Sequence, residues 1–523
     1  MVETSVSHSS ISGLVAIPRT PLKSRNSGYY RYSGICSDVR FGAHSNTLKN
    51  LQRAVAERVL MVPGDNGGLK HCPRPESEGY FNLMMRPFHE QLVRRISNDS
   101  SFPIPPLSDA AFVALYSGAK KKRYQDACDS LLRESVIPKD AHVGSFVKVE
   151  KINFTAKCDP CPRVIQPRSF RYSAALGKCI KHLEKPLFKC IDDVFGGPTV
   201  LKGYDCIASA THLQSMWSEF RHPVAIGMDA SRFDQHCSVP ALKWEHEIWK
   251  SLSTSRGLGD LLKLQLETVG RGYVADGVVK YTTNGCRMSG DMNTSSGNCL
   301  LMCAMVYSYC SSHGIRKFRL ANNGDDCVLI IEARDLPLVL DVPAWFTRIG
   351  FTMKVEEPVY TFEQISFCQT QPVWDGVGYR MVRDPRVSIA KDLTSTLDLS
   401  NARTKALWLN AMHHGGKALV SGIPVLQNFY NIYPTTNIQM TSRETTLNDF
   451  MQSGFSRMRP RVCSGERAVT PEARYSFWLA FGILPDMQII LETRFNSISL
   501  DRCQVSLEQD YRELSILVEN HLH

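Results

Sequence analysis

Two adjacent carboxylates, Asp325 and Asp326, follow Gly324 between two apolar runs within residues 318–331. This pattern predicts a β-hairpin that carries both carboxylates on its turn. Like charges on a tight turn repel each other, and a divalent cation is the usual means of offsetting that repulsion. The hairpin therefore indicates a metal site, although an Asn-Gly-Asp-Asp turn alone is also typical of a solvated loop.

A second segment, residues 224–236, has the pattern of an apolar strand that ends at Asp229, and Asp234 follows five residues later. Ser238 and Pro240 then have the character of a helix cap and first turn. A strand-end carboxylate beside the two hairpin carboxylates is the arrangement needed to hold two Mg²⁺ ions about 3.5–4 Å apart. Asp229 alone would also suit the N-cap of a helix.

The third segment, residues 287–298, is rich in Gly and Ser and runs into an apolar stretch, residues 299–307. Thr294 and Asn298 are four residues apart, so on a helix they share one face. Small residues allow a backbone to approach a sugar or a phosphate closely. The segment predicts either a nucleotide-binding loop or a Ser-rich turn that caps a buried core helix.

The order of these segments resembles palm motifs A, B and C of viral RNA-dependent RNA polymerases. The strings DASRFDQH, SGDMNTSSGN and NNGDDCVLI are similar to the tombusvirus-like branch, which contains carmoviruses, luteoviruses and umbraviruses. Residues 350–356, 365–369 and 146–168 resemble motifs D, E and F, and the resemblance covers roughly residues 45–480. It implies an RNA-directed RNA polymerase that replicates a positive-strand RNA genome.

Two other classes of protein share parts of this pattern. A reverse transcriptase has the same two-metal palm, but it usually has a bulky aromatic residue in the turn and blocks the ribose 2′-hydroxyl. The polar residues Asp234 and Asn298 argue against that class. A catalytically inactive palm kept as an RNA-binding scaffold has no support in the sequence, because Asp229, Asp325 and Asp326 are all present.

The resemblance implies an α+β fold, a right-hand polymerase with fingers, palm and thumb, in which helices flank an antiparallel palm sheet and the fingers close on the thumb. The expected parts are an extended or disordered segment or strap at 1–45, fingers at 46–222 with motif F at 146–168, palm at 223–235, fingers or palm helices at 236–285, palm at 286–385, and thumb and tail at 386–523.

The resemblance also implies roles for the charged residues of the palm. Asp229 and Asp325 are expected to bind both Mg²⁺ ions, for which Mn²⁺ can substitute, and Asp326 is expected to assist them. Lys354 in motif D is either a general acid that protonates the pyrophosphate or a surface charge paired with a neighbouring glutamate.

Nucleotide recognition is expected from two further groups of residues. Asp234 and Asn298 would recognise the ribose 2′-hydroxyl, while Ser289 and Thr294 would support them or contact the template backbone. Each cation of motif F would otherwise be an ordinary surface charge. The cations expected to grip the triphosphate are Lys148, Lys151, Arg163 and Arg168.

Composition agrees with a polyanionic partner such as template and product RNA. Lys and Arg number 61 against 51 Asp and Glu, which gives a formal charge of +10. The 17 Cys without regular pairing indicate reduced thiols.

No run reaches the ~18 apolar residues of a membrane span. The resemblance implies host-cytoplasmic replication complexes on membranes, joined through an upstream segment or a membrane-anchored auxiliary replicase protein, with host factors.

Two local patterns have competing interpretations. Residues 116–124 place four consecutive cations between aromatic residues, which suits an RNA-tracking groove or a solvated helix face.

The spacing of a structural zinc site is present in Cys158, Cys161, Cys179 and His182. The first pair lies inside motif F, which should remain mobile, and Cys179 belongs to the buried side of an amphipathic helix. We therefore expect no stoichiometric zinc.

Overall fold

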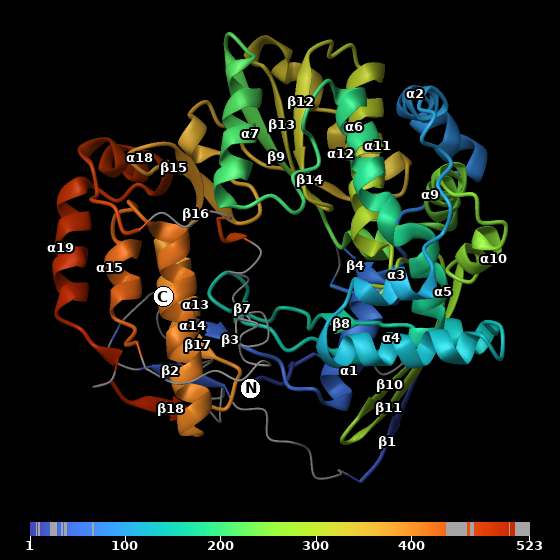
Figure 1. Ribbon diagram of the computed structural model, residues 1–523, viewed down its shortest axis with the longest axis horizontal. Coiled ribbons are helices and arrows are strands. Elements are labelled where there is room, and N and C mark those ends of the chain that lie inside the picture. Colours follow the sequence, from blue (N-terminus) through green and yellow to red (C-terminus); the bar gives the residue numbers. More distant parts are fainter. Residues whose placement is uncertain are drawn as a thin grey trace.

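The protein combines two main sheets with helices, and a computed structural model describes most of the chain (Figure 1). The described residues are 1–6, 8, 11–20, 29–32, 35, 39–64, 67–435, 458–460, 465–500 and 503–507. The central sheet is antiparallel, with the strand order β12-β13-β9-β14. Its strands are β9 (Pro223–Ala230), β12 (Phe318–Asn322), β13 (Asp326–Glu332) and β14 (Met353–Val355).

Both faces of the central sheet are buried, which explains why its strands are almost continuously apolar. Phe318 pairs with Ile331 across β12 and β13, so the predicted hairpin is confirmed. Along β13, Leu329 and Ile331 pack into one hydrophobic core, whereas Val328 and Ile330 pack into a second core on the opposite face. This alternation is the two-residue period of a strand. Carboxylates replace apolar residues only near the strand ends.

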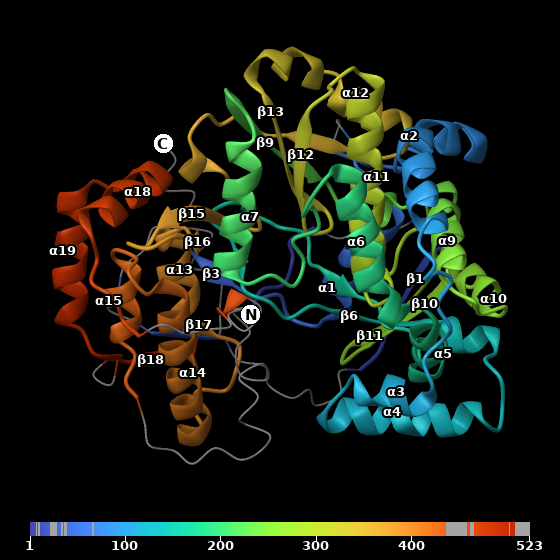
Figure 2. The ribbon, with the colours of Figure 1, turned by 45° about the horizontal axis from the view of Figure 1, so that its top comes forward.

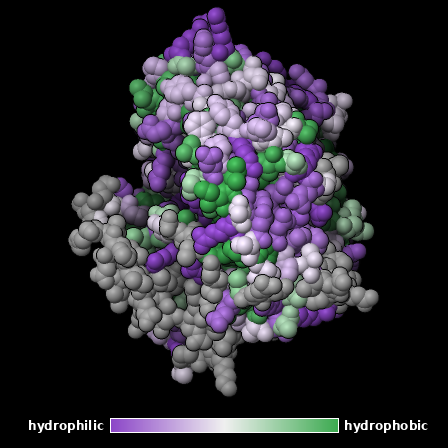
Figure 3. Space-filling model, turned by 90° about the vertical axis from the view of Figure 1, so that its left-hand side faces the viewer, coloured by the Kyte–Doolittle hydropathy of each residue, from purple (hydrophilic) through white to green (hydrophobic). Residues whose placement is uncertain are grey.

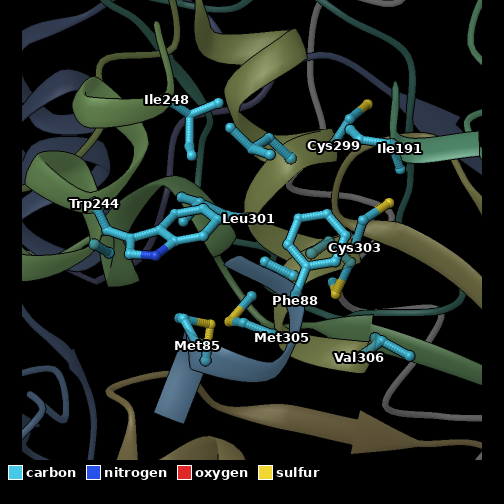
Figure 4. Close-up of a cluster of buried hydrophobic side chains, with 14 of the residues drawn as sticks. Met85, Phe88, Ile191, Trp244, Ile248, Cys299, Leu301, Cys303, Met305 and Val306 are labelled. Carbon is cyan, nitrogen blue, oxygen red and sulfur yellow. The ribbon is translucent and has the colours of Figure 1, made fainter. Parts of the chain in front are cut away.

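The first core surrounds helix α11, which is buried on nearly all sides. Figure 4 shows Phe88, Trp244 and Leu301 meeting in this core. The apolar stretch 299–307 is therefore a core helix, as predicted, and no helix in the described part of the chain has the length and hydropathy of a membrane span. The helices of this core include α2 (Glu78–Ser97), α6 (Glu184–Phe195), α9 (Val239–Leu252), α11 (Thr294–Ser312) and α12 (Val342–Arg348).

Helix α9 begins where the sequence predicts. Ser238 is its N-cap, and the Ser238 hydroxyl accepts a hydrogen bond from the Ala241 N–H at 3.4 Å. Pro240 stands in the first turn, where its missing N–H costs nothing. The opposite face of the central sheet is covered by α7 (Cys206–Ser218), whose Leu213 and Met216 enter the second core.

A second sheet has five strands in the order β1-β11-β10-β6-β8, and only the β10–β6 pair is parallel. Helix α1 and the π-helical turn that continues it cover one face through Leu51, Val55 and Val59. Predicted motif F contributes β8 and the end of β6. The elements are β1 (Leu14–Pro18), α1 (Leu48–Val55), the π-helix (Ala56–Leu60), β6 (Val143–Val147), β8 (Val164–Ile165), β10 (Glu267–Val274) and β11 (Gly277–Asn284).

Three helices next to this sheet form a small core of their own, in which Phe112, Tyr124 and Ala174 meet. They are α3 (Asp109–Ala114), α4 (Gly118–Leu131) and α5 (Phe170–Ile180). Short elements elsewhere in the described chain include α8 (Phe233–His236), α10 (Leu258–Lys263), β4 (Val62–Pro63), β5 (Leu69–Lys70) and 3₁₀ turns at Pro138–Ala141, Lys181–Leu183, Ala333–Val339 and Phe362–Gln364.

The chain beyond residue 384 is mainly helical, and these helices gather on the side of the central sheet away from α3 and α4 (Figure 2). Trp408, Met412 and Leu419 are buried. Trp478 is only half-buried, because Phe477 occupies the inward face of its helix. The elements are β15 (Thr370–Trp374), β16 (Tyr379–Arg383), α13 (Pro385–Asp392), α14 (Ala402–Val420), α15 (Leu426–Asn431), α18 (Pro471–Phe481) and α19 (Pro485–Asn496). Residues 508–523 of the predicted tail lie outside the described residues.

The N-terminal segment, predicted as extended or disordered, is extended where it is described, and it pairs with three separate sheets. Its strand β1 joins the second sheet, and β2 lies between β17 and β18. Strand β3 pairs with β7, next to motif F. The segment therefore connects the second sheet with the C-terminal helices. The strands are β2 (Tyr30–Tyr32), β3 (Phe41–Gly42), β7 (Ile152–Asn153), β17 (Thr394–Ser395) and β18 (Val505–Leu507).

Helix α19 has an inverted arrangement of polar and apolar residues. Gln488 and Glu492 are only 0% and 9% exposed, whereas Met487, Ile489 and Ile490 are 49%, 48% and 57% exposed. Arg474 of α18 donates to both oxygens of Glu492, and Gln488 Nε2 donates to carbonyls of α18 and of the loop before α19. Figure 3 looks on to this side of the molecule, where hydrophobic atoms, drawn in green, gather near the centre.

Candidate active site

The turn between β12 and β13 carries Asp325 at its tip. Gly324 has φ of +93°, a left-handed conformation that glycine adopts without penalty. The buried Asn322 side chain fixes this turn, because its Nδ2 donates to the Gly324 carbonyl at 2.7 Å and its Oδ1 accepts from the Gly324 N–H at 3.1 Å. Asp325 is exposed, and Asp326 is half-buried at the start of β13. The hairpin thus holds two carboxylates on a well-supported backbone.

Three charged residues lie side by side across neighbouring strands of the central sheet. Asp326 pairs with Asp229, and Asp229 pairs with Lys354 on its other side. Directly paired residues of antiparallel strands project from the same face of a sheet, so these three side chains share one face. The sheet therefore brings the predicted carboxylates together and adds Lys354 beside them.

The carboxylates of this site repel one another. Burial, followed by the charge of Asp325, raises the pKa of Asp326 to about 6. Although Asp325 is exposed to the cavity, the surrounding protein partly desolvates its carboxylate and raises its pKa, and the charge of Asp229 adds to that shift. A divalent cation would favour the ionised forms, and carboxylate oxygens are the ligands that Mg²⁺ prefers. Across the described residues, no three His, Cys, Asp or Glu side chains already converge on one metal position.

Asp234 and Asn298 form a hydrogen-bonded pair in the same region, with Asn298 Nδ2 donating to Asp234 Oδ1 at 2.7 Å. Burial raises the pKa of Asp234, while the Asn298 hydrogen bond and the charge of Arg287 oppose that rise. Asn298 Oδ1 is buried and has no hydrogen-bond partner among the residues described. It is therefore available to accept a hydrogen bond from a ligand hydroxyl.

Ser289 and Thr294 bond to the protein backbone around the loop that precedes α11. Ser289 Oγ donates to the Val164 carbonyl at 3.1 Å and accepts from the Gln166 N–H at 3.2 Å. Thr294 Oγ1 donates to the Met288 carbonyl at 2.6 Å. Ser289 thus attaches the loop to strand β8 of motif F, and Thr294 closes the loop on itself.

A cavity of about 1220 Å³ lies in front of these side chains. Its lining contains nine Arg or Lys residues and five Asp or Glu residues, an excess of cations that suits a polyphosphate ligand. Its size is sufficient for a small-molecule ligand. The predicted site residues that line it are Lys148, Arg163, Asp229, Asp234, Ser289, Asp325 and Lys354.

Lys148 and Arg163 share one carboxylate in motif F. The Lys148 N–H donates to the Arg163 carbonyl at 2.8 Å, which places the two residues opposite each other. Lys148 Nζ lies 2.6 Å from Glu150 Oε2, and Arg163 Nη1 lies 3.4 Å from the same oxygen. Glu150 is therefore the internal counter-ion of two residues predicted to bind a triphosphate.

Lys151 and Arg168 do not line the cavity. Lys151 Nζ donates to the Lys391 carbonyl of α13 at 2.9 Å, and burial lowers the pKa of Lys151 to about 8. Arg168 forms a buried ion pair with Asp291 and donates to Thr268 Oγ1 at 3.0 Å. These positions argue against the predicted triphosphate role of both residues, because each cationic group already has protein partners away from the cavity.

Several cations of the cavity were not predicted from the sequence. Arg232 and Arg287 lie within or next to the strings that carry the resemblance, so their place in those strings was a usable signal. Arg58 belongs to the π-helical turn and Lys70 to β5, and no sequence pattern relates either to the carboxylates. The unpredicted cations are Arg53, Arg58, Lys70, Lys157, Arg232 and Arg287.

The four residues with zinc-like spacing face different neighbours. Cys161 Sγ contacts a carbonyl of α1, and Cys179 Sγ contacts a carbonyl one turn earlier in α5. His182 Nε2 lies 2.9 Å from the Pro105 carbonyl, and Cys158 is exposed. The lack of zinc stays a prediction, and these contacts give no reason to revise it.

The basic run on α4 is exposed along its length. Within the described chain, residues 120–123 form no ion pair with an acidic side chain. Lys120 Nζ lies 4.9 Å from the centre of the Tyr116 ring, and the Tyr116 hydroxyl lies 3.8 Å from the sulfur of Met292, in the loop before α11. The run is therefore an uncompensated positive surface connected to the loop that borders the cavity.

Comparisons with known proteins all indicate the same family. Residues 14–503 match a family model described as viral RNA dependent RNA polymerase. The RNA-directed RNA polymerase of Cymbidium ringspot virus is 43% identical over 92% of this chain and 57% of its own length. The proteins of the same name from Tobacco necrosis virus (strain A) and Turnip crinkle virus are 44% and 41% identical, over 95% and 90% of this chain and 67% and 60% of theirs. These matches confirm the resemblance drawn from the motifs. The chain spans little more than half the length of the Cymbidium ringspot virus and Cucumber necrosis virus proteins.

Proposed function

The chain belongs to the viral RNA-dependent RNA polymerase family, and from this premise we propose that it copies an RNA template. In this function, it transfers a nucleoside monophosphate from an NTP to the 3′-hydroxyl of a growing RNA. One observation carries the proposal. Asp229, Asp325, Asp326 and Lys354 meet at the end of one sheet, where all but Asp326 line the cavity that Asp234 also lines.

We assign the parts of a right-hand polymerase to this fold. The palm comprises residues 223–235 and 286–385, the fingers 46–222 and 236–285, and the thumb 386–500. A closed hand is supported by the hydrogen bond from Lys151 to the Lys391 carbonyl and by the N-terminal segment, which joins the second sheet and the C-terminal helices.

The three carboxylates are the proposed metal ligands. Two Mg²⁺ ions held there would activate the RNA 3′-hydroxyl and neutralise charge on the triphosphate. We assign the binding of both ions to Asp229 and Asp325, and Asp326, which pairs with Asp229 across the sheet, lies beside them. The rigid turn around Gly324 keeps these ligands in one orientation, which is what an in-line transfer requires.

The remaining residues orient the nucleotide. Lys148 and Arg163 would exchange their contact with Glu150 for contacts with the triphosphate. Asn298 Oδ1 and Asp234 would accept hydrogen bonds from the ribose hydroxyls. Lys354 lines the cavity beside Asp229, and this position supports a role in which it would donate a proton to the departing pyrophosphate.

The partners follow from the reaction and from the family. Template RNA, product RNA and NTPs are the expected ligands. We propose that the enzyme acts in the host cytoplasm, in replication complexes that reach a membrane through an upstream segment or a membrane-anchored viral auxiliary protein, with host factors. The greater length of the matched relatives is compatible with such a context.

An extension assay tests the proposal directly. The purified chain is incubated with a homopolymeric RNA template and the complementary NTP, with and without a primer and with and without Mg²⁺. We expect metal-dependent RNA synthesis that is lost in Asp325→Ala and kept in Asp486→Asn, which changes an exposed carboxylate on α19.

The possible outcomes separate the alternatives. Preferential incorporation of dNTPs would indicate a reverse transcriptase. Tight RNA binding without any metal-dependent synthesis would indicate an inactive scaffold. Either result would contradict the proposed function. The reactions with and without primer would also show how synthesis starts.

A further inference from the structure

A buried ion pair lies beside the candidate ribose site. Glu245 of α9 and Arg287, which precedes the Ser-Gly loop, are in contact, and both side chains are 0% exposed. The Glu245 carboxylate is well satisfied, because its Oε1 accepts from Trp249 Nε1 and from Asn293 Nδ2, each at 2.8 Å, and its Oε2 accepts from Arg287. This pair therefore unites α9, the loop and the first turn of α11.

Stability alone is a poor explanation for this pair. Removing two charges from water is costly, and apolar residues of similar volume are often at least as stable. Arg287 adds to the cost, because its Nε and Nη1 are buried without a hydrogen-bond partner in the described part of the chain. A requirement for fixed geometry accounts for such an arrangement better than a contribution to folding does.

The ion pair runs alongside the hydrogen bond between Asp234 and Asn298. On one side, the backbone N–H of Arg287 donates to the backbone carbonyl of Asp234 at 2.8 Å. On the other side, Glu245 packs against Gly297, the residue before Asn298, so closely that a Cβ there would overlap the Glu245 carboxylate. Together, the two connections therefore link α8 to α11. The hydrogen bond between Asp234 and Asn298 links the same two helices.

We propose, on the basis of the polymerase function proposed above, that the Glu245–Arg287 ion pair is a positioning element that fixes the distance between Asp234 and Asn298 and thereby sets the preference for NTP over dNTP. A ribose 2′-hydroxyl gains from both residues only while their spacing is kept. A deoxyribose lacks that hydroxyl, so it loses less when α8 and α11 shift apart.

Single-nucleotide incorporation on an RNA primer–template tests this inference. The kcat/KM values for ATP and dATP are measured for wild type, Glu245→Gln and Arg287→Lys. We expect the ATP-to-dATP ratio to fall at least about tenfold in both variants. The ratio is independent of the fraction of active enzyme, so partial misfolding does not affect it.

A matched pair elsewhere supplies the control. Arg380 of β16 and Asp375 of the turn between β15 and β16 form a buried ion pair, with side chains 1% and 4% exposed. Arg380→Lys should lower the melting temperature but keep the wild-type ratio. In the Asn298→Ala background, Arg287→Lys should cause little further loss of discrimination, because both changes act on the same contact.

Equal losses with ATP and dATP in Glu245→Gln and Arg287→Lys would overturn the inference and leave a purely structural role. If neither variant folds, Trp249→Phe decides, because it leaves the ion pair in place and removes one hydrogen bond to Glu245 together with part of a buried ring. A ratio lowered at least about threefold supports the inference, and an unchanged ratio overturns it. A wild-type chain that incorporates neither nucleotide would instead refute the proposed function, and this inference with it.

Discussion

At the scale of single residues, Asp229 provides the most direct test of the metal site. Asp229→Asn keeps the shape of the side chain but removes one of the charges that would hold the ions. Loss of several kcal/mol of transition-state stabilisation corresponds to a rate at least about a thousandfold lower. Primer extension should show this loss, while circular dichroism and RNA binding remain as in wild type. Synthesis by Asp229→Asn within tenfold of wild type would exclude Asp229 as a metal ligand.

The raised pKa of Asp326 predicts a specific pH dependence. As pH falls through about 6, Asp326 takes up a proton and metal binding weakens, so the rate of synthesis should decline. More Mg²⁺ should move the midpoint to lower pH, because the ion and the proton compete for the same oxygens. Without metal, the folded state holds this proton more tightly than the unfolded state, so stability should decrease as pH rises through about 6.

Initial rates measured across this pH range at two Mg²⁺ concentrations test the decline of the rate at low pH and the dependence of its midpoint on Mg²⁺. A midpoint that does not move with Mg²⁺ would assign the titration to a group outside the metal site. Asp326→Asn should abolish the Mg²⁺-dependent movement even if it retains some activity.

At the scale of elements, the strands and helices that carry the site were predictable because their signals are local. The β12–β13 hairpin follows from two apolar runs around Gly324, and α9 follows from Ser238 and Pro240. The length of α11 follows from the apolar stretch after the Ser-Gly loop. Each of these predictions depended only on residues that are neighbours in the sequence, and tertiary contacts did not override the local preference.

The direction of individual side chains was not predictable in the same way. Arg168 turns to Asp291, and Lys151 turns to a carbonyl of α13, in both cases because of partners more than a hundred residues away. Arg58 enters the cavity from a π-helical turn that has no sequence signature. Such placements depend on the packing of whole elements, which a pattern of residue types does not specify.

Helix α4 yields a prediction about RNA binding. Three lysines in its first turns, Lys120, Lys121 and Lys122, stand at the positive end of the helix dipole, where each costs about 0.3–1 kcal/mol. Replacing all three by Gln should therefore keep or raise the melting temperature. It should also weaken single-stranded RNA binding and reduce the slope of log affinity against log salt by about 2, since each phosphate contact contributes about 0.7.

Fluorescence anisotropy with an RNA oligonucleotide at several salt concentrations measures this slope. Lys185→Gln with Lys189→Gln, on the exposed face of α6, is the control for a general loss of positive charge. If the α4 variant and the control bind RNA alike, the basic run is an ordinary solvated helix face.

At the scale of the whole molecule, the N-terminal segment should determine how firmly the C-terminal helices are held. The ring of Tyr32 is 0% exposed and stacks on Trp408, with centroids 5.9 Å apart and planes 7° apart. Tyr32→Ala should cost about 3–5 kcal/mol, as for other large aromatic residues in cores. Hydrogen exchange should accelerate in α14 before it does in the central sheet.

The control for this experiment is Tyr273→Ala, because Tyr273 on β10 is 62% exposed. Its effect on stability should remain within about 0.5 kcal/mol. Equal acceleration of exchange in α14 and in the central sheet after Tyr32→Ala would show that the molecule unfolds as one unit and that β2 has no local role.

The same strand sets the order in which the molecule can be completed during synthesis. Arg31 of β2 pairs with Thr394 on one side and with Ser506 on the other. A ribosome makes the two neighbours of β2 only hundreds of residues after β2 itself. Until then β2 has exposed edges that must avoid other partners. Among the described sheets, the one that contains β2 is thus the last that can be completed, and pairing over so long a separation favours slow folding.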